Sequence, residues 1–178
     1  MSKTTNFVFW ALYAVAWLIF VGLSIEAGGL LVNFYFSIYK PEIIPNLYQK
    51  LDLIQMYQDS KMAFFGIYSF ILIIAILKAY LFYIVIRLMH KMDRLKPFNN
   101  FVSRQISLIS YFTLTIGLLS FIARQLVKNL MHHGFVPDTI NQFWVDSEAF
   151  IMMSAIIYII ATIFKKGVEI QNENDLTV

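Results

Sequence analysis

Four long apolar runs dominate this chain of 178 residues and limit what it can fold into. The runs are Phe7–Val32, Met62–Ile86, Ile106–Leu126 and Phe143–Phe164. Each run can reach the roughly 20 residues that a helix needs to cross a hydrocarbon core of about 30 Å. Charged residues make up 14% of the chain, well below the roughly 25% usual in soluble domains. We therefore predict an all-α, polytopic membrane protein, folded as an antiparallel bundle of four transmembrane helices.

The segments between the runs are too short to hold a separate soluble domain, so we expect residues 1–178 to form a single transmembrane domain. The predicted spans are about residues 7–32, 62–87, 105–131 and 143–165. The other segments are an outer loop, a basic loop and an acidic tail, at residues 33–61, 88–104 and 166–178. In the outer loop, Leu47, Leu51 and Ile54 recur at helical spacing, which predicts one short amphipathic helix at the membrane surface.

Basic residues gather on one side of the predicted spans. They are Lys3, Arg87, Lys91, Arg94, Lys96, Arg104, Lys165 and Lys166. On the opposite side, the lysines are balanced by Glu42, Asp52 and Asp59. By the positive-inside rule, both termini and the basic loop are expected on the cytoplasmic side.

The fourth run is short, and its length places a charge in the membrane. Ala149–Phe164 would be only about 24 Å long as a helix, too short to cross. The span must therefore include Glu148 at its outer end, where Phe143 and Trp144 fit an interfacial aromatic belt. Glu26 on the first span and Arg124 on the third lie at a similar depth in the membrane, because each is equally far along its span from the inner end.

Periodicity indicates that these three charges can face one another. The third span has a stripe of small and polar residues, at Thr113, Gly117, Ser120 and Arg124. The corresponding positions on the fourth and first spans are Glu148, Ala155 and Thr162, and Gly22, Glu26 and Gly29. We predict a structural charge cluster in which Arg124 is flanked by Glu26 and Glu148, buried near the outer surface. Independent snorkelling of the three groups to the interface and a cation or substrate site are the alternatives.

Lys78 is the other intramembrane charge. It lies about 13 Å along its helix from Arg87, and no carboxylate occurs at that depth on another predicted span. Its long stem can carry the ammonium to lipid phosphates, or the residue can mark a functional pocket.

The sequence contains few residue patterns typical of catalytic or metal-binding sites. The chain has no cysteine, and the neighbours His132 and His133 point about 100° apart on a helix, so they are a poor metal pair. No phosphate-binding loop, zinc-protease motif or nucleophile elbow occurs. We therefore expect a protein that is not an enzyme, with no cofactor and no metal. The net charge of +3 comes from residues that flank spans and gives no reason to expect direct nucleic-acid binding.

Four segments resemble a bacterial family of small four-span membrane proteins, called domain of unknown function twenty-nine seventy-five. They are Arg87–Phe98, Leu77–Phe82, Ile122–Arg124 and the tail Glu169–Val178. The resemblance covers essentially the whole chain and implies a four-span fold and no established activity. It also implies a partner, because family members are often encoded beside a small helix-turn-helix regulator. We expect the protein in the bacterial inner membrane.

These observations lead to one functional hypothesis and one alternative. The first is a non-enzymatic regulatory module that sequesters, or signals to, a small helix-turn-helix transcription regulator. Its predicted binding residues are Arg87, Lys91, Arg94, Lys96, Glu169, Glu173 and Asp175. The alternative is a transporter or channel subunit that uses Glu26, Lys78, Arg124 and Glu148. The sequence leaves open whether the chain forms homo-oligomers and whether the acidic tail is an ordered surface or a frayed end.

Overall fold

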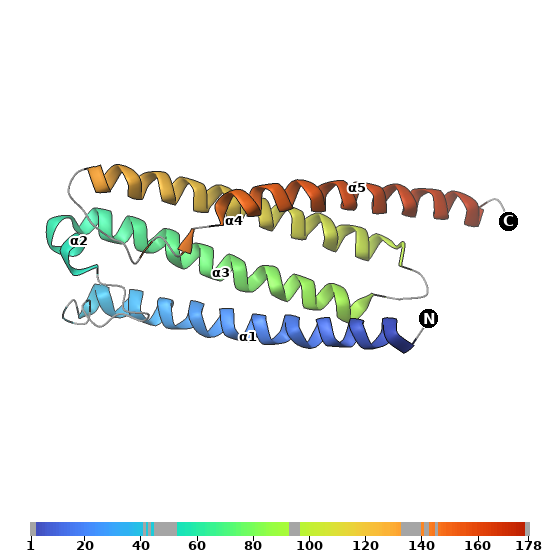
Figure 1. Ribbon diagram of the computed structural model, residues 1–178, viewed down its shortest axis with the longest axis horizontal. Coiled ribbons are helices and arrows are strands. Elements are labelled where there is room, and N and C mark those ends of the chain that lie inside the picture. Colours follow the sequence, from blue (N-terminus) through green and yellow to red (C-terminus); the bar gives the residue numbers. More distant parts are fainter. Residues whose placement is uncertain are drawn as a thin grey trace.

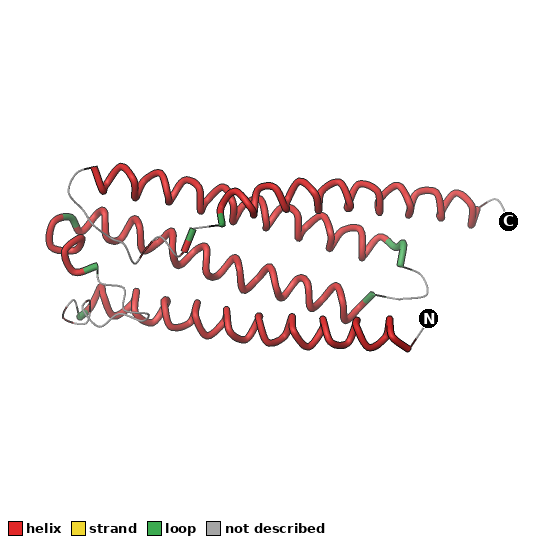
Figure 2. Tube along the Cα trace, in the orientation of Figure 1, coloured by secondary structure: helices red, strands yellow, loops and turns green. Residues whose placement is uncertain are grey.

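The computed structural model describes residues 3–40, 42, 44, 53–92, 97–132, 140, 143–144 and 146–176. The described residues form the helices α1 (Lys3–Tyr39), α2 (Ile54–Asp59), α3 (Lys61–Lys91), α4 (Asn100–His132) and α5 (Ser147–Leu176). In that part of the chain, α1, α3, α4 and α5 are each long and apolar enough to cross a membrane. The predicted all-helical fold of long apolar helices packed together is therefore confirmed (Figure 2).

The long helices lie side by side in chain order (Figure 1). The main contacts join α1 to α3, α3 to α4 and α4 to α5. Both termini lie at the end of the molecule where α3 connects to α4, and α2 lies at the opposite end. We call these the basic end and the α2 end, because a group of cations lies at the first of them: Arg87, Lys91, Arg104, Lys165 and Lys166.

Capping side chains set where two of the long helices begin. The Ala63 amide donates a hydrogen bond to the Ser60 hydroxyl oxygen at 3.3 Å, at the start of α3. The Val102 amide donates to Asn99 Oδ1 at 2.9 Å, at the start of α4. Serine and asparagine satisfy amides that have no partner in the first turn of a helix. Both helices therefore begin before the predicted spans do.

The first residues of the predicted outer loop are helical in the structure. Helix α1 continues to Tyr39 rather than ending at residue 32, so it is about 55 Å long. The short helix of this segment is α2, where Leu53 and Met56 are buried against the core of the α2 end. Leu47 and Leu51, which predicted this helix, lie outside the described residues. Helix α2 covers the end of the helical array.

Close packing joins α4 to α5. Gly117 of α4 lies so close to α5 that an added Cβ would be 2.8 Å from Ile151 Cγ1 and 3.0 Å from the Ile151 amide nitrogen. The Ser110 hydroxyl donates a hydrogen bond to the Ser154 carbonyl across the same interface, at 3.0 Å. Small residues let two membrane helices approach in this way. On α4, the predicted stripe forms the interface: Thr113, Gly117 and Ser120 are buried.

The stripe predicted for α5 is wrong by one residue. The buried positions that recur every seven residues are Ser147, Ser154, Ala161 and Val168. The predicted Glu148, Ala155 and Thr162 are exposed beside them. On α1, Gly22 has no atom within 4 Å of an added Cβ, so it makes no close helix contact.

Three of the described residues between α4 and α5 pack into the array. Helix α5 begins at Ser147, part of the way along α4 rather than beside its end (Figure 1). Ile140, Phe143 and Trp144 are buried in the core, with exposed fractions of 0%, 6% and 2%. The prediction that Phe143 and Trp144 form an interfacial belt is therefore wrong, because their spacing from Ile140 lets one apolar face pack inward.

Candidate functional site

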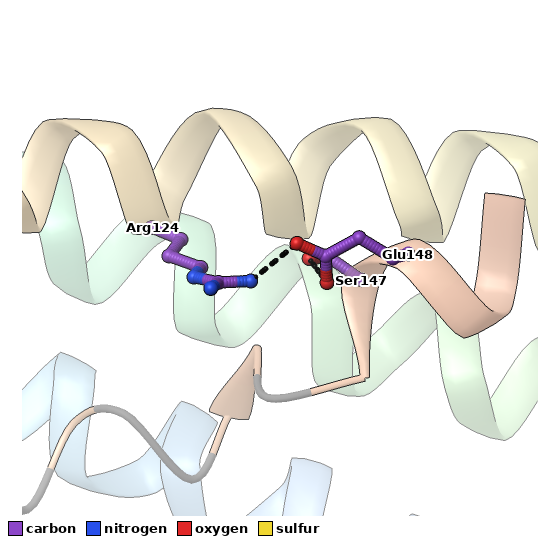
Figure 3. A network of polar contacts seen from close by, with 3 residues as sticks. All are labelled: Arg124, Ser147 and Glu148. Atoms are coloured by element: carbon purple, nitrogen blue, oxygen red, sulfur yellow. Dashed lines mark hydrogen bonds and ion pairs between the residues drawn. The ribbon is translucent and has the colours of Figure 1, made fainter.

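An ion pair joins α4 to α5 (Figure 3). Arg124 Nη1 lies 2.5 Å from Glu148 Oε1, and the Ser147 hydroxyl donates a hydrogen bond to the other carboxylate oxygen at 2.9 Å. Two turns earlier on the same face of α4, Gly117 contacts Ile151, which follows Glu148 by one turn. The close α4–α5 packing therefore places the guanidinium beside the carboxylate.

The pair is not the buried cluster that we predicted. The exposed fractions of the Arg124 and Glu148 side chains are 33% and 59%. Glu148 is the exposed neighbour of the buried Ser147, so its side chain lies at the edge of the α4–α5 interface and not inside it. Glu26 is not part of the pair: among the described residues, Arg124 forms an ion pair with Glu148 and none with Glu26. The physical reason is that α1 packs on α3, while the pair lies on α4 and α5.

We expect Arg124→Ala to lower the thermal stability of the detergent-solubilised protein by no more than Lys128→Ala does. Lys128 is exposed one turn further along α4 and serves as the matched control. Exposed ion pairs contribute little to stability because water screens both charges. A much larger loss for Arg124→Ala in thermal unfolding would show that the pair acts as the buried cluster of the original prediction.

Lys78 faces a small polar cavity between α3, α4 and the start of α5. The cavity is about 10 Å³, roughly the room for one water molecule. Its lining residues are Lys78, Ser120, Phe143, Trp144, Asp146, Ser147 and Phe150. Our prediction that no carboxylate lies at the depth of Lys78 is wrong, because Asp146, just before α5, lines this cavity with it. Glu26 of α1 also lies within electrostatic range of the ammonium.

Two further contacts define this cavity. Lys78 Nζ lies 5.8 Å from the centroid of the Phe150 ring, within the range of a cation–π contact. The indole nitrogen of Trp144 is buried and has no hydrogen-bond partner in the described part of the chain. A buried N–H without a partner is costly, so a site of this kind favours an occupant that accepts a hydrogen bond.

At the basic end, the predicted partner-binding cations gather over one aromatic ring. Arg87 and Lys91 of α3 each lie 5.9 Å from the centroid of Phe101 on α4. Both are exposed, as are Lys165 and Lys166 on α5. Arg94 and Lys96 lie outside the described residues.

The acidic tail is a continuation of α5 rather than a frayed end. The helix runs through Gly167 to Leu176. The Phe98 ring lies before α4, 5.1 Å from the Phe164 ring, and Val168 is buried. An added Cβ on Gly167 would lie 2.7 Å from Phe98 Cδ1, so the missing side chain is what lets the ring dock there.

The predicted acidic residues follow this docked turn. Glu169 and Glu173 are exposed, and Asp175 belongs to α5 with a side chain outside the described residues. At about 1.5 Å per residue, the part of α5 from Ser147 to Lys166 already accounts for about 30 Å. The acidic turns therefore extend beyond the length that a bilayer requires. In Figure 1, this end of α5 lies beyond the ends of the other long helices.

Replacing Phe98 with alanine should loosen these last turns of α5. We expect faster amide hydrogen exchange in residues 168–176 of Phe98→Ala and unchanged exchange in α3, because the Phe98 contact is at the end of the array. The control is Phe7→Ala, since Phe7 is 74% exposed. Equal exchange in the wild type and Phe98→Ala would show that the docked ring does not hold the tail.

Sequence reasoning missed Phe98 and Trp144 as site residues. The available signal for Phe98 was an aromatic residue between Pro97 and the capping Asn99, with Gly167 one turn after Phe164 on the distant helix. The signal for Trp144 was its spacing from Ile140 and Phe143, which is that of a buried helical face. Neither signal identifies the contacting partner.

These helices define an integral membrane protein with four candidate spans in the described part of the chain. The family described as "Protein of unknown function (DUF2975)" matches residues 37–178, and the chain belongs to that family. No curated protein and no solved structure matches the chain.

Proposed function

We propose that this protein is a non-enzymatic binding module of the bacterial inner membrane, and that its working surface is the basic end. The observation that supports this most directly is the docked helical tail of α5. An ordered helix that extends past the membrane and carries exposed Glu169 and Glu173 offers a fixed surface to a soluble protein. Both termini and the basic end are cytoplasmic in this proposal, as the positive-inside rule favours.

The partner in this proposal is a small helix-turn-helix transcription regulator, as the family resemblance implies. Such a protein carries positive charge to meet DNA phosphates, so an acidic helix can compete for the same surface. The cations Arg87 and Lys91 lie near the membrane, where anionic lipid headgroups attract them. In this proposal the acidic tail recognises the partner, and the basic residues position the bundle in the membrane.

Purification of the tagged protein from its native membranes tests this proposal. We expect a small basic helix-turn-helix protein to co-purify at low ionic strength and to be lost as salt is raised, because screening weakens contacts between exposed charges. Recovery of no such protein, or of one whose retention is independent of salt, would contradict the proposed mode of recognition.

The Lys78 cavity favours a second candidate, a transporter or channel subunit. Ionisable groups between membrane helices often mark a path for ions or substrates. Lys78, Asp146 and Ser120 come from three different parts of the chain and line one space. A flux of ions or small solutes across liposomes containing the purified protein, lost in Lys78→Met, would support this candidate over the binding module.

A further inference from the structure

An apolar groove adjoins the polar cavity at Lys78. The groove is about 340 Å³, and its walls come from α3, α4 and α5. Its lining includes Leu81, Phe82, Val85, Thr113, Met153 and Ile157. Because α5 packs on α4 rather than on α3, the α3 and α5 side chains stand on either side of the groove, with α4 between them.

The groove and the cavity lie next to each other and share one wall residue. Phe150 lines both spaces. On α3, Lys78 lies one turn before Leu81 and Phe82, so it shares their helix face. On α4, Ser120 of the cavity lies two turns after Thr113 of the groove, again on one face. Lys78 of the cavity and Val85 of the groove are therefore about 10 Å apart along α3, so the apolar groove lies directly beside the polar space.

The polar space is built to receive a hydrogen-bonding group. Trp144 is 2% exposed, and its indole N–H has no partner among the described residues. The Lys78 ammonium and the Ser120 hydroxyl line the same space and add further donors, and the Asp146 carboxylate adds an acceptor. The space is only about 10 Å³, which limits the group to about the size of a hydroxyl.

We propose that the groove and the cavity together bind one single-chain amphiphile with an uncharged hydroxyl head. The head lies beside Lys78 and Trp144, and the hydrocarbon chain lies along the groove between α3 and α5. An uncharged head is favoured over a carboxylate because the Asp146 carboxylate already lines the cavity beside Lys78. The inference does not rest on the proposed function, since the basic end takes no part in it.

Photolabelling of the full-length protein in lipid nanodiscs tests this inference. The probe is decanol with a diazirine in its chain, and the adducts are mapped by mass spectrometry. We expect labelling of the α5 segment from Ala149 to Ile157, competed by unlabelled decanol. Lys78→Met and Trp144→Phe should each reduce it about tenfold, because each removes a hydrogen-bond donor that lines the cavity. Lys61→Met, at the exposed start of α3, is the control and should label like the wild type.

Two comparison probes separate a built site from hydrocarbon that merely fills a groove. Decane with the same diazirine has no head and should label the segment about tenfold less than decanol does. Equal labelling by decane, or unchanged labelling in Lys78→Met, would overturn the site. Stronger labelling by the decanoate probe would overturn the uncharged head. If Lys78→Met does not fold, Met153→Trp fills the groove without touching the cavity, and it must abolish labelling by decanol for the inference to stand.

Discussion

The Gly117→Leu variant should lose the packing of α4 against α5 and unfold at a much lower temperature than the wild type. A Cβ at this position would lie 2.8 Å from a side-chain carbon of Ile151 and 3.0 Å from its backbone nitrogen. The backbone nitrogen cannot rotate away, so the helices must separate. Overpacking by even one methyl group costs about 1–3 kcal/mol, so we expect Gly117→Ala to be clearly destabilised and Gly117→Leu more so.

Gly22→Ala and Gly66→Ala are the matched controls for this prediction. Neither glycine has an atom within 4 Å of an added Cβ, and both lie in long helices. Alanine is the better helix former, so neither control should lose stability. Thermal unfolding in one detergent, followed by circular dichroism, measures all four variants. If Gly117→Leu unfolds at the same temperature as the two controls, α4 and α5 do not pack closely at this position.

The spans could be predicted from the sequence because length and hydropathy alone decide whether a helix can cross a bilayer. The stripe on α4 was also readable, since Gly117 and Ser120 are small residues on one face of an apolar helix. On α5 the same reasoning chose Glu148, Ala155 and Thr162, one residue away from the buried stripe. That prediction started the stripe at the charged residue Glu148, whereas the interface is formed by the small side chains one position earlier.

The arrangement of the helices was not available from periodicity. Glu26 lies at a depth similar to that of Arg124, but depth does not say which helices are neighbours. The structure pairs Arg124 with Glu148 and leaves Glu26 on α1, which packs on α3. Asp146 was missed beside Lys78 for a related reason. A connection is expected to run over the surface, but Phe143 and Trp144, just before Asp146, are buried in the core.

The helical structure of the tail depends on a contact with a distant residue, which the sequence alone cannot locate. Gly167 suggests a helix end, because glycine often follows the last turn. In the structure it instead makes room for Phe98, a residue far away in the chain. The glycine therefore serves a tertiary contact, and the helix continues through it.

Removal of Glu169–Val178 should abolish retention of the proposed helix-turn-helix regulator and leave the helical array folded. The deletion removes the exposed acidic residues Glu169 and Glu173, and it keeps Val168, the last buried residue described in α5. Electrostatic recognition of a DNA-binding protein depends on such acidic residues. The thermal unfolding of the truncated protein should match that of the wild type, which separates a lost surface from a lost fold.

Charge reversal provides a second form of the same prediction. The double variant Glu169→Lys and Glu173→Lys keeps the helix length but places like charges against a basic partner, so we expect retention to fall as it does in the truncated protein. Asp59→Lys changes an exposed carboxylate at the α2 end and is the control. Loss of retention in Asp59→Lys would indicate a general effect of net charge rather than a surface on the tail.

Membrane retention of the proposed helix-turn-helix regulator in living cells tests the central claim most directly. The regulator is followed by fractionation of cells that express either the full-length protein or the protein lacking Glu169–Val178. The proposed binding module predicts regulator in the membrane fraction with the full-length protein and in the soluble fraction with the truncated one. Regulator that stays in the membrane fraction after truncation would contradict the role of the tail, and regulator that is soluble in both would contradict the binding module itself.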